Sequence, residues 1–286
     1  MTTSRPKAVP LGKRTALTLA LATAAGLIAF CWPLLVAPTT DTVGHVSDAP
    51  MVFALVLPVL IVVAVTSISE GGIDARTVAM LGVLTAVGTV VRAIGAGLAG
   101  VELIFFLVII GGRVFGAGFG FLLGSTTILA SALLTAGIGP WLPFQMLACA
   151  WVGAGAGLLP RVDGRKEIVL LSVYGFGSAL AFGLMMNLWF WPYLVPDGTA
   201  ASFVPGAPVL ENLRRVVLFT IATSAGWDMI RAVVNVVLLV TTGPHLLRVL
   251  RRMVPSAGFG STMHSFPQPG AVTWQSPSSV RSGHRR

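Results

Sequence analysis

Charged residues are scarce in this sequence. Asp, Glu, Lys and Arg together make up 10% of its 286 residues, whereas a soluble domain usually carries about 25%. The few charges stand in short segments between long apolar runs, and the mean hydropathy is +0.87. This pattern is typical of a membrane protein with several transmembrane helices, because a helix satisfies its own backbone hydrogen bonds within lipid.

Cysteines and catalytic motifs are also scarce. The two cysteines, Cys31 and Cys149, lie in separate apolar runs and can form neither a disulfide framework nor a metal cluster. The sequence has no G-x-x-x-x-G-K-[ST] phosphate loop, which excludes an ATPase within this chain. It also lacks the H-E-x-x-H and G-x-S-x-G motifs of common hydrolases. We therefore expect no enzyme activity, no metal site and no cofactor.

Basic residues exceed acidic ones, giving a net charge of +9. The loops predicted at 37–49, 138–141 and 193–211 contain no Lys or Arg. The opposite loops and the helix ends beside them carry most of the basic residues: Arg5, Lys7, Lys13, Arg14, Arg76, Arg113, Arg161, Arg165, Lys166, Arg248, Arg251 and Arg252. The positive-inside rule places both termini in the cytoplasm, so no nucleic-acid partner is expected. Arg92, Arg214 and Arg215 are exceptions at the predicted outer helix ends.

Apolar segments predict an all-α integral membrane protein with about eight transmembrane helices. A span needs about 20 apolar residues to cross a core of about 30 Å. The run 101–137 is too long for one helix, so we expect a break at Gly111–Arg113. The short piece before it counts as a span, because otherwise the Arg161–Lys166 cluster would lie outside. The predicted spans are 15–36, 50–68, 75–97, 98–112, 113–137, 142–160, 168–192 and 212–242.

Small residues recur at fixed intervals in the middle of the chain. Gly112, Gly116, Gly120 and Gly124 are four residues apart. On one helix they would share a face, and small residues on such a face let a neighbouring helix approach closely. We expect this run to pack against another helix.

A polar stripe follows the last predicted span. Its members are separated by 4, 4, 3 and 4 residues, which places them on one helix face: Thr220, Ser224, Asp228, Arg231 and Asn235. Asp228 and Arg231 are one turn apart and can form an ion pair. Ionisable residues within a span are costly and face the protein interior or a cavity. The stripe is either an interhelical hydrogen-bond network or a ligand contact.

Aromatic and amide residues gather at the predicted outer ends of neighbouring spans. Arg92 and Glu102 flank the short turn between the third and fourth spans, close to this group. Its members are Trp141, Gln145, Asn187, Trp189 and Trp191. Tryptophans there are common as an interfacial belt. An amide and a charge pair among aromatic rings also suit a small-molecule pocket, so both interpretations stay open.

Five segments in this order resemble the substrate-specific S components of energy-coupling factor (ECF) vitamin transporters. They are Glu102–Leu107, Gly111–Gly124, Gly139–Met146, Met186–Trp191 and Gly226–Ala232. The resemblance covers residues 71–253 and implies a six-helix core. It leaves a cytoplasmic basic N-terminus at 1–14, two additional transmembrane helices at 15–70, and a tail at 254–286. That tail is rich in Ser, Pro and Gly, and we expect it to be disordered and cytoplasmic.

The resemblance also implies a function and partners. An S component captures a vitamin or related micronutrient outside, docks on a transmembrane T component, and releases the ligand inward with energy from two ATPase subunits. Cobalamin or a related corrinoid is one ligand that the resemblance suggests. Ala75 and Ala79 match the Ala-x-x-x-Ala motif that meets the T component. The alternative is a stand-alone secondary permease or channel for a small molecule.

Overall fold

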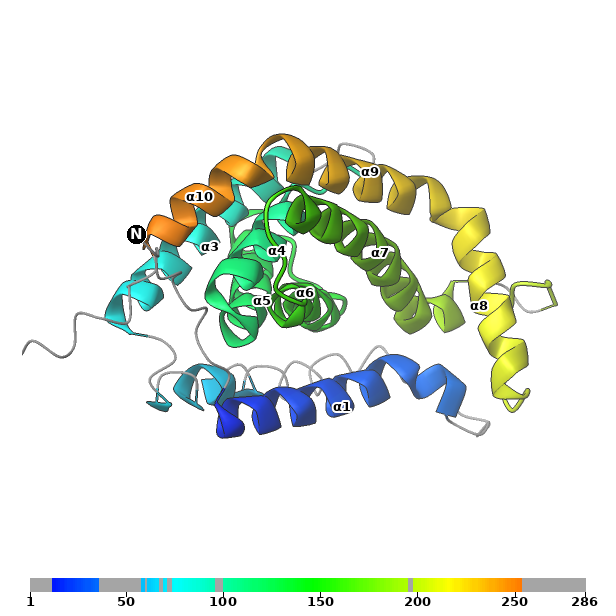
Figure 1. Cartoon of the computed structure of the whole chain (residues 1–286). Coiled ribbons are helices and arrows are strands. Elements are labelled where there is room, and N and C mark those ends of the chain that lie inside the picture. The colour runs from blue at the N-terminus through cyan, green and yellow to red at the C-terminus, as the bar shows by residue number, and fades with distance from the viewer. Residues whose placement is uncertain are drawn as a thin grey trace, which may run out of the picture.

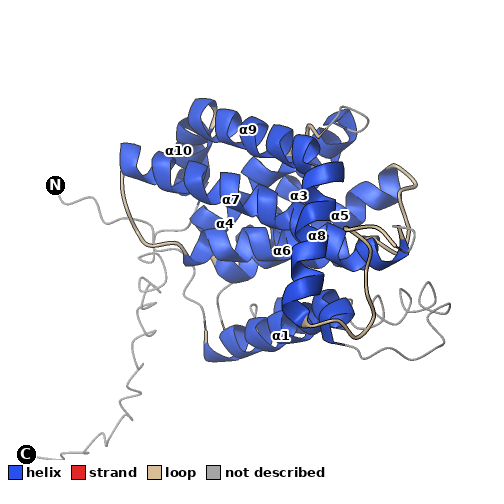
Figure 2. Ribbon diagram, turned by 90° about the vertical axis from the view of Figure 1, so that its right-hand side faces the viewer, coloured by secondary structure: helices blue, strands red, loops and turns tan. Residues whose placement is uncertain are grey.

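The computed structural model describes residues 12–35, 58–59, 61–66, 69–70, 74–95, 100–194 and 198–253. The regular elements in these ranges are all helical, which confirms the predicted all-α class (Figures 1 and 2). The predicted basic N-terminus, most of the second span at 50–68 and the tail from 254 lie outside the described residues. The helices are α1 (Lys13–Leu35), α3 (Ala75–Gly95), α4 (Ile104–Phe115), α5 (Ala117–Leu134), α6 (Leu142–Leu158), α7 (Arg165–Phe190), the 3-10 turn η2 (Trp191–Tyr193), α8 (Val209–Thr223), α9 (Ala225–Thr241) and α10 (Gly243–Met253).

Four of the described helices are long and apolar enough to cross a membrane: α1, α3, α5 and α7. The bent pair of α8 and α9 would make a fifth span if it crosses as one unit, and α4 and α6 are apolar but shorter. These lengths and compositions are those of a multi-pass membrane protein.

Helices α4, α5 and α6 form the centre of the molecule, with α7 and α9 beside them and α1 along another side (Figure 1). Helix α5 is the most deeply enclosed of the four long helices. The ring of Phe30 on α1 lies 5.1 Å from Phe144 and 5.6 Å from Trp151 of α6. The first predicted additional helix therefore packs directly on the core.

The chain breaks between α4 and α5 at Gly116, so the predicted break at Gly111–Arg113 is wrong. Gly116 has φ 100°, a conformation that glycine adopts without steric cost. Arg113 instead stays in the last turn of α4, held by hydrogen bonds to Glu167 and to the Leu159 carbonyl. These bonds explain why the arginine does not mark the break.

The glycine run packs against α6, as its spacing predicted, although it is divided between two helices. A side chain at Gly112 on α4 or at Gly120 on α5 would collide with the Gly153 carbonyl of α6, and one at Gly124 with that of Cys149. The predicted single helical face is wrong because Gly116 redirects the chain. The three backbones nevertheless meet at Gly153, as small residues allow.

The last predicted span, 212–242, is two helices bent by 73° at Ser224. Helix α9 follows α7, whereas α8 packs Val216 and Phe219 on Leu188 and Trp191 at the far end of α7. One straight helix could not make both sets of contacts. The hydroxyls of Thr220 and Thr223 bond to backbone carbonyls four residues earlier, a contact that often bends helices.

Candidate functional site

Glu102 binds two arginines that are far apart in the sequence. Its Oε1 lies 3.6 Å from Nε of Arg92, at the end of α3, and its Oε2 lies 3.1 Å from Nε of Arg231 on α9. Glu102 itself precedes α4 by two residues. The carboxylate thus joins the predicted outer-mouth residues to the predicted polar stripe, a connection that the sequence analysis did not foresee.

Arg231 is held on several sides. Its Nη1 donates to Oδ1 of Asp228 at 2.7 Å, as the three-residue spacing predicted, and to the Ala179 carbonyl of α7 at 3.4 Å. The guanidinium also lies 5.1 Å from the ring centre of Phe182 and 5.9 Å from that of Phe105. Cations at such distances are attracted to the face of the ring, so both charge and aromatic contact fix its position.

Arg92 extends the cluster to two more helices. Its Nη1 donates to Oγ of Ser131 on α5 at 2.8 Å, and its Nη2 reaches Oε1 of Gln145 on α6 at 3.5 Å. We call Arg92, Glu102, Gln145, Asp228 and Arg231 the Glu102 network. It connects α3, α6 and α9 through side chains, and two arginines balance two carboxylates.

The Glu102 network is partly open and has unused hydrogen-bonding capacity. The side chains of Arg92 and Glu102 are 21% and 22% exposed, while Asp228 is 3% exposed. Nε of Arg92 and Oδ2 of Asp228 are buried and have no hydrogen-bond partner; the 3.6 Å from Arg92 to Glu102 is an ion pair too long for a hydrogen bond. Buried polar atoms without partners are exceptional and call for an explanation.

Gly183 on α7 makes room for the acidic end of the network. A side chain at this position would collide with the carboxylate of Asp228. Helices α7 and α9 therefore lie close together where the charged pair lies. The signal for this contact was a glycine within an apolar run, which the sequence analysis did not single out.

The remaining stripe residues lie apart from the Glu102 network. Asn187 on α7 donates to Oγ1 of Thr220 at 3.2 Å and to Oγ of Ser224 at 2.8 Å. Asn235 donates to the Gly175 carbonyl at 2.9 Å. The stripe therefore faces α7 along much of its length. Thr220, Ser224 and Asn235 join helices together, while Asp228 and Arg231 belong to the network.

The three predicted tryptophans do not share one pocket. Trp189 packs on Phe144 at 4.7 Å and on Phe190 at 5.6 Å. Trp191 is fully buried and donates to the Ala201 carbonyl, while Trp141 is 41% exposed at the start of α6. Gln145 and Asn187 likewise have different partners. The structure brings Arg92, Glu102 and Gln145 together and leaves Asn187 and the tryptophans outside the network.

Ala75 and Ala79 are both exposed in the first turns of α3. Gly82 continues this face with nothing near the position of an added side chain. Asp74 caps the helix by accepting the backbone N–H of Thr77 at 2.8 Å, and hydrogen bonds from Thr77 lower the pKa of this carboxyl. The predicted docking motif thus lies on an accessible, small-residue surface.

The structure contains a second charged cluster that the sequence analysis did not predict. Oε1 of Glu167, in the first turn of α7, lies 2.7 Å from Nε of Arg113 on α4 and 2.6 Å from Nη2 of Arg251 on α10. Glu167 is 2% exposed. We call these three residues the Glu167 network. The available signal was an acidic residue directly before the predicted span 168–192, because a carboxylate at such a position needs a cationic partner when it is buried.

Comparison with known proteins gives no further identification. No family model matches the chain, and neither the curated proteins nor the solved structures include a significant match. The helices define the class, a multi-pass membrane protein. Within the described residues, no three His, Cys, Asp or Glu side chains are grouped to hold a metal ion.

Proposed function

We propose that this chain is the substrate-binding subunit of an ECF-type importer. It would cross the cell membrane about eight times with both termini in the cytoplasm. It would capture a vitamin-like small molecule at the N-terminal end of α4 and deliver it inward after docking on a T component with two ATPases. The observation that carries the proposal is the Glu102 network, a partly exposed charge cluster that joins α3, α6 and α9 beside the N-terminal end of α4.

The energetics of the Glu102 network support ligand binding. Charged side chains within a bilayer are expensive and are by default candidates for a functional site. A cluster that served stability alone would satisfy its buried polar atoms. Here Nε of Arg92 makes only the 3.6 Å ion pair with Glu102, and Oδ2 of Asp228 has no hydrogen-bond partner. A ligand offering both a donor and an acceptor would satisfy the two atoms. Such a ligand would also contact α3, α6 and α9 at once, so its binding would depend on how these helices are arranged.

The exposed face of α3 supports the docking part of the proposal. Ala75, Ala79 and Gly82 are exposed on one face of α3, and none of the three carries a large side chain. Small residues four apart allow close helix contact that depends on packing alone. Such a contact can form and separate, as an exchangeable T component requires.

A specific observation favours the alternative, a stand-alone permease. Helices α8 and α9 form a helix pair bent by 73°, and broken helices are typical of secondary transporters. In those proteins the break lies at the substrate site. Here Ser224 at the break accepts a hydrogen bond from Asn187. Asp228 and Arg231 lie one to two turns further along α9, so the charged residues are not at the break itself, unlike in those proteins.

The test is binding by the purified full chain without nucleotide. We expect one ligand from a panel of vitamins, cobalamin included, to raise the melting temperature, because a ligand that binds the folded state stabilises it by mass action. Glu102→Gln should weaken binding of this ligand by at least about tenfold, since it removes the negative charge that pairs with Arg92 and Arg231. Glu211→Gln, which breaks an exposed ion pair with Arg215, is the matched control.

Two outcomes would contradict the proposal. Vesicles containing only this chain should bind the ligand but not accumulate it, whereas accumulation along an ion gradient would establish the permease. Equal affinity in Glu102→Gln and the wild type would place the ligand site elsewhere.

Replacing Ala75 and Ala79 with Leu tests docking separately. We expect uptake in cells carrying the T component and ATPases to fall at least about tenfold, because bulky side chains prevent close helix approach. Ligand affinity of the purified chain should stay unchanged. Leu substitutions at Val83 and Val87, exposed large residues of the same helix, are the control; an equal loss of ligand affinity would show that α3 serves the binding site instead.

A further inference from the structure

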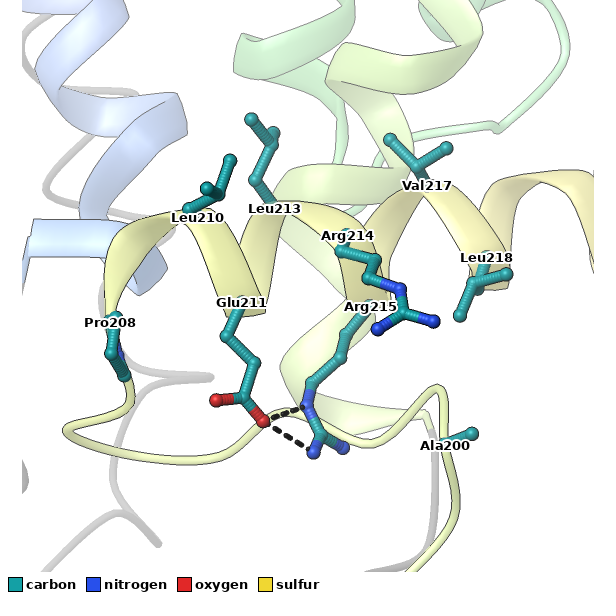
Figure 3. A pocket seen from close by; sticks show the side chains of 9 residues that line it. All are labelled: Ala200, Pro208, Leu210, Glu211, Leu213, Arg214, Arg215, Val217 and Leu218. Carbon is teal, nitrogen blue, oxygen red and sulfur yellow. Dashed lines mark hydrogen bonds and ion pairs between the residues drawn. The ribbon is translucent and has the colours of Figure 1, made fainter.

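Two neighbouring arginines on α8, Arg214 and Arg215, have different surroundings. Arg215 pairs with Glu211 at 2.7 Å and donates to the carbonyls of Thr199 and Ser202. It therefore fastens the preceding loop to the helix. Arg214 is exposed and has no hydrogen bond or ion pair with any described residue. Figure 3 shows its guanidinium beside the Glu211–Arg215 pair without an interaction of its own.

Arg214 borders a cavity whose walls are mostly apolar. The cavity has a volume of about 770 Å³, within the range of about 300–1,000 Å³ that small-molecule sites occupy. Leu210, Leu213 and Val217 project from the same side of α8 (Figure 3), and Leu210 is 77% exposed. None of the lining residues belongs to the Glu102 network.

The opposite face of α8 is already occupied. Val216 and Phe219 pack on Leu188 and Trp191, and Asn212 exchanges two hydrogen bonds with the backbone of Val204. The face with Val216 and Phe219 therefore holds α8 in place. The face with Leu210, Leu213, Arg214 and Val217 is exposed. In a membrane protein the solvent for such a face is lipid.

We propose that this face is a binding site for an anionic phospholipid. Its phosphate would pair with Arg214, and its acyl chains would cover Leu210, Leu213 and Val217. The charge supports this occupant, because Arg214 has no acidic partner among the described residues. The carboxylate of Glu211 forms its ion pair with Arg215 instead. It also accounts for an arginine on the side of the membrane where the loops lack basic residues. The proposal needs only that the chain lies in a membrane and is independent of the proposed transport function.

Photo-crosslinking tests the site. The full chain is reconstituted in phosphatidylcholine vesicles that contain a small fraction of phosphatidylglycerol with a diazirine in its acyl chain, and labelled residues are mapped by mass spectrometry. We expect labelling within 209–221, and at least several-fold less with a phosphatidylcholine probe of the same chains. Arg214→Gln should reduce phosphatidylglycerol labelling about fivefold, because one basic residue contributes about 1 kcal/mol to binding of an anionic lipid. Inorganic phosphate should not compete at millimolar concentration.

Two further variants separate lipid binding from other causes. Leu213→Trp should reduce labelling by filling the cavity while Arg214 remains. Arg165→Gln, an exposed arginine at the other end of α7, should leave labelling within 209–221 unchanged. Equal labelling by both probes, or unchanged labelling in Arg214→Gln, would overturn the proposal. So would a disulfide-linked dimer that Leu210→Cys forms and the wild type does not, because it would show that a second copy covers this face.

Discussion

Two carboxylates lie near opposite ends of α4: Glu102 just before the helix, and Glu167 on α7 beside its last turn. Each binds two arginines, but the two differ in burial and in the distances to their partners. Glu167 contacts Arg113 and Arg251 at 2.7 and 2.6 Å and is almost fully buried. Glu102 contacts Arg92 and Arg231 at 3.6 and 3.1 Å and stays partly exposed. The same arrangement of charges is therefore closed at one end of the helix and open at the other.

The difference indicates different roles for the two ends. In the Glu167 network, the guanidinium of Arg113 also donates to the carbonyls of Leu159 and Val162, so the loop between α6 and α7 is fixed along with α10. The Glu102 network leaves polar atoms without partners. A closed network stabilises one arrangement of helices, whereas an open one can exchange its contacts with a ligand.

Removing the carboxylate of Glu167 should lower the free energy of unfolding more than the other substitutions considered below. Glu167→Gln leaves Arg113, whose side chain is 6% exposed, as an uncompensated buried cation. Breaking a buried pair in this way costs about 3–5 kcal/mol. Unfolding in mixed micelles should show this loss. Glu211→Gln should cost less than about 1 kcal/mol, since its pair is exposed. A similar small loss for both variants would show that the Glu167 network does not hold the fold.

The sequence predicted local features of the two networks better than their partners. Helical spacing was sufficient for the pair of Asp228 and Arg231, because residues three apart share a helix face. The contact between Glu102 and Arg231 joins positions 129 residues apart, and nothing in the periodicity of either segment indicates it. The sequence predicts a break at Gly111–Arg113, but the long side chain of Arg113 reaches Glu167 from within α4.

Helix ends were also only partly predictable. A glycine with positive φ ends α4 at Gly116, and glycines at 111 and 112 gave the same signal in the sequence. The bend at Ser224 depends on which surfaces α8 and α9 find on α7 and α1. Tertiary packing of this kind overrides the pattern within one apolar run. The number of crossings stays a prediction for the same reason.

A methyl group at Gly183 should weaken the open network by separating its two helices. Gly183→Ala places a carbon against the carboxylate of Asp228, and overpacking of this kind costs about 1–3 kcal/mol. Gly177→Ala is the matched control on the same helix, because nothing lies near that position. It should be neutral or stabilising by up to about 1 kcal/mol through helix propensity. Equal unfolding free energies for the two variants would mean that α9 is free to move away from α7.

The smallest effect concerns a third carboxylate, Glu70, which is bound by a hydroxyl and two backbone N–H groups and not by arginine side chains. Glu70 accepts the backbone N–H groups of Arg14 and Thr15 at 2.8 and 3.0 Å, and the Thr15 hydroxyl at 2.6 Å. The Thr15 hydroxyl, followed by these amides, lowers the pKa of Glu70 below its usual 4.5. Because the folded-state pKa is lowered, the contact stabilises α1 fully above about pH 4.5 and is lost as the pH falls through the lowered value.

Hydrogen exchange should detect this change at the first turn of α1. After correction for intrinsic exchange rates, the amides of Arg14 and Thr15 should be less protected at pH 3 than at pH 7, and Glu70→Gln should remove most of the difference. Protection of α1 that is independent of pH in the wild type would show that Glu70 does not cap this helix. The three carboxylates would then differ in kind, with only those bound by arginines holding helices together.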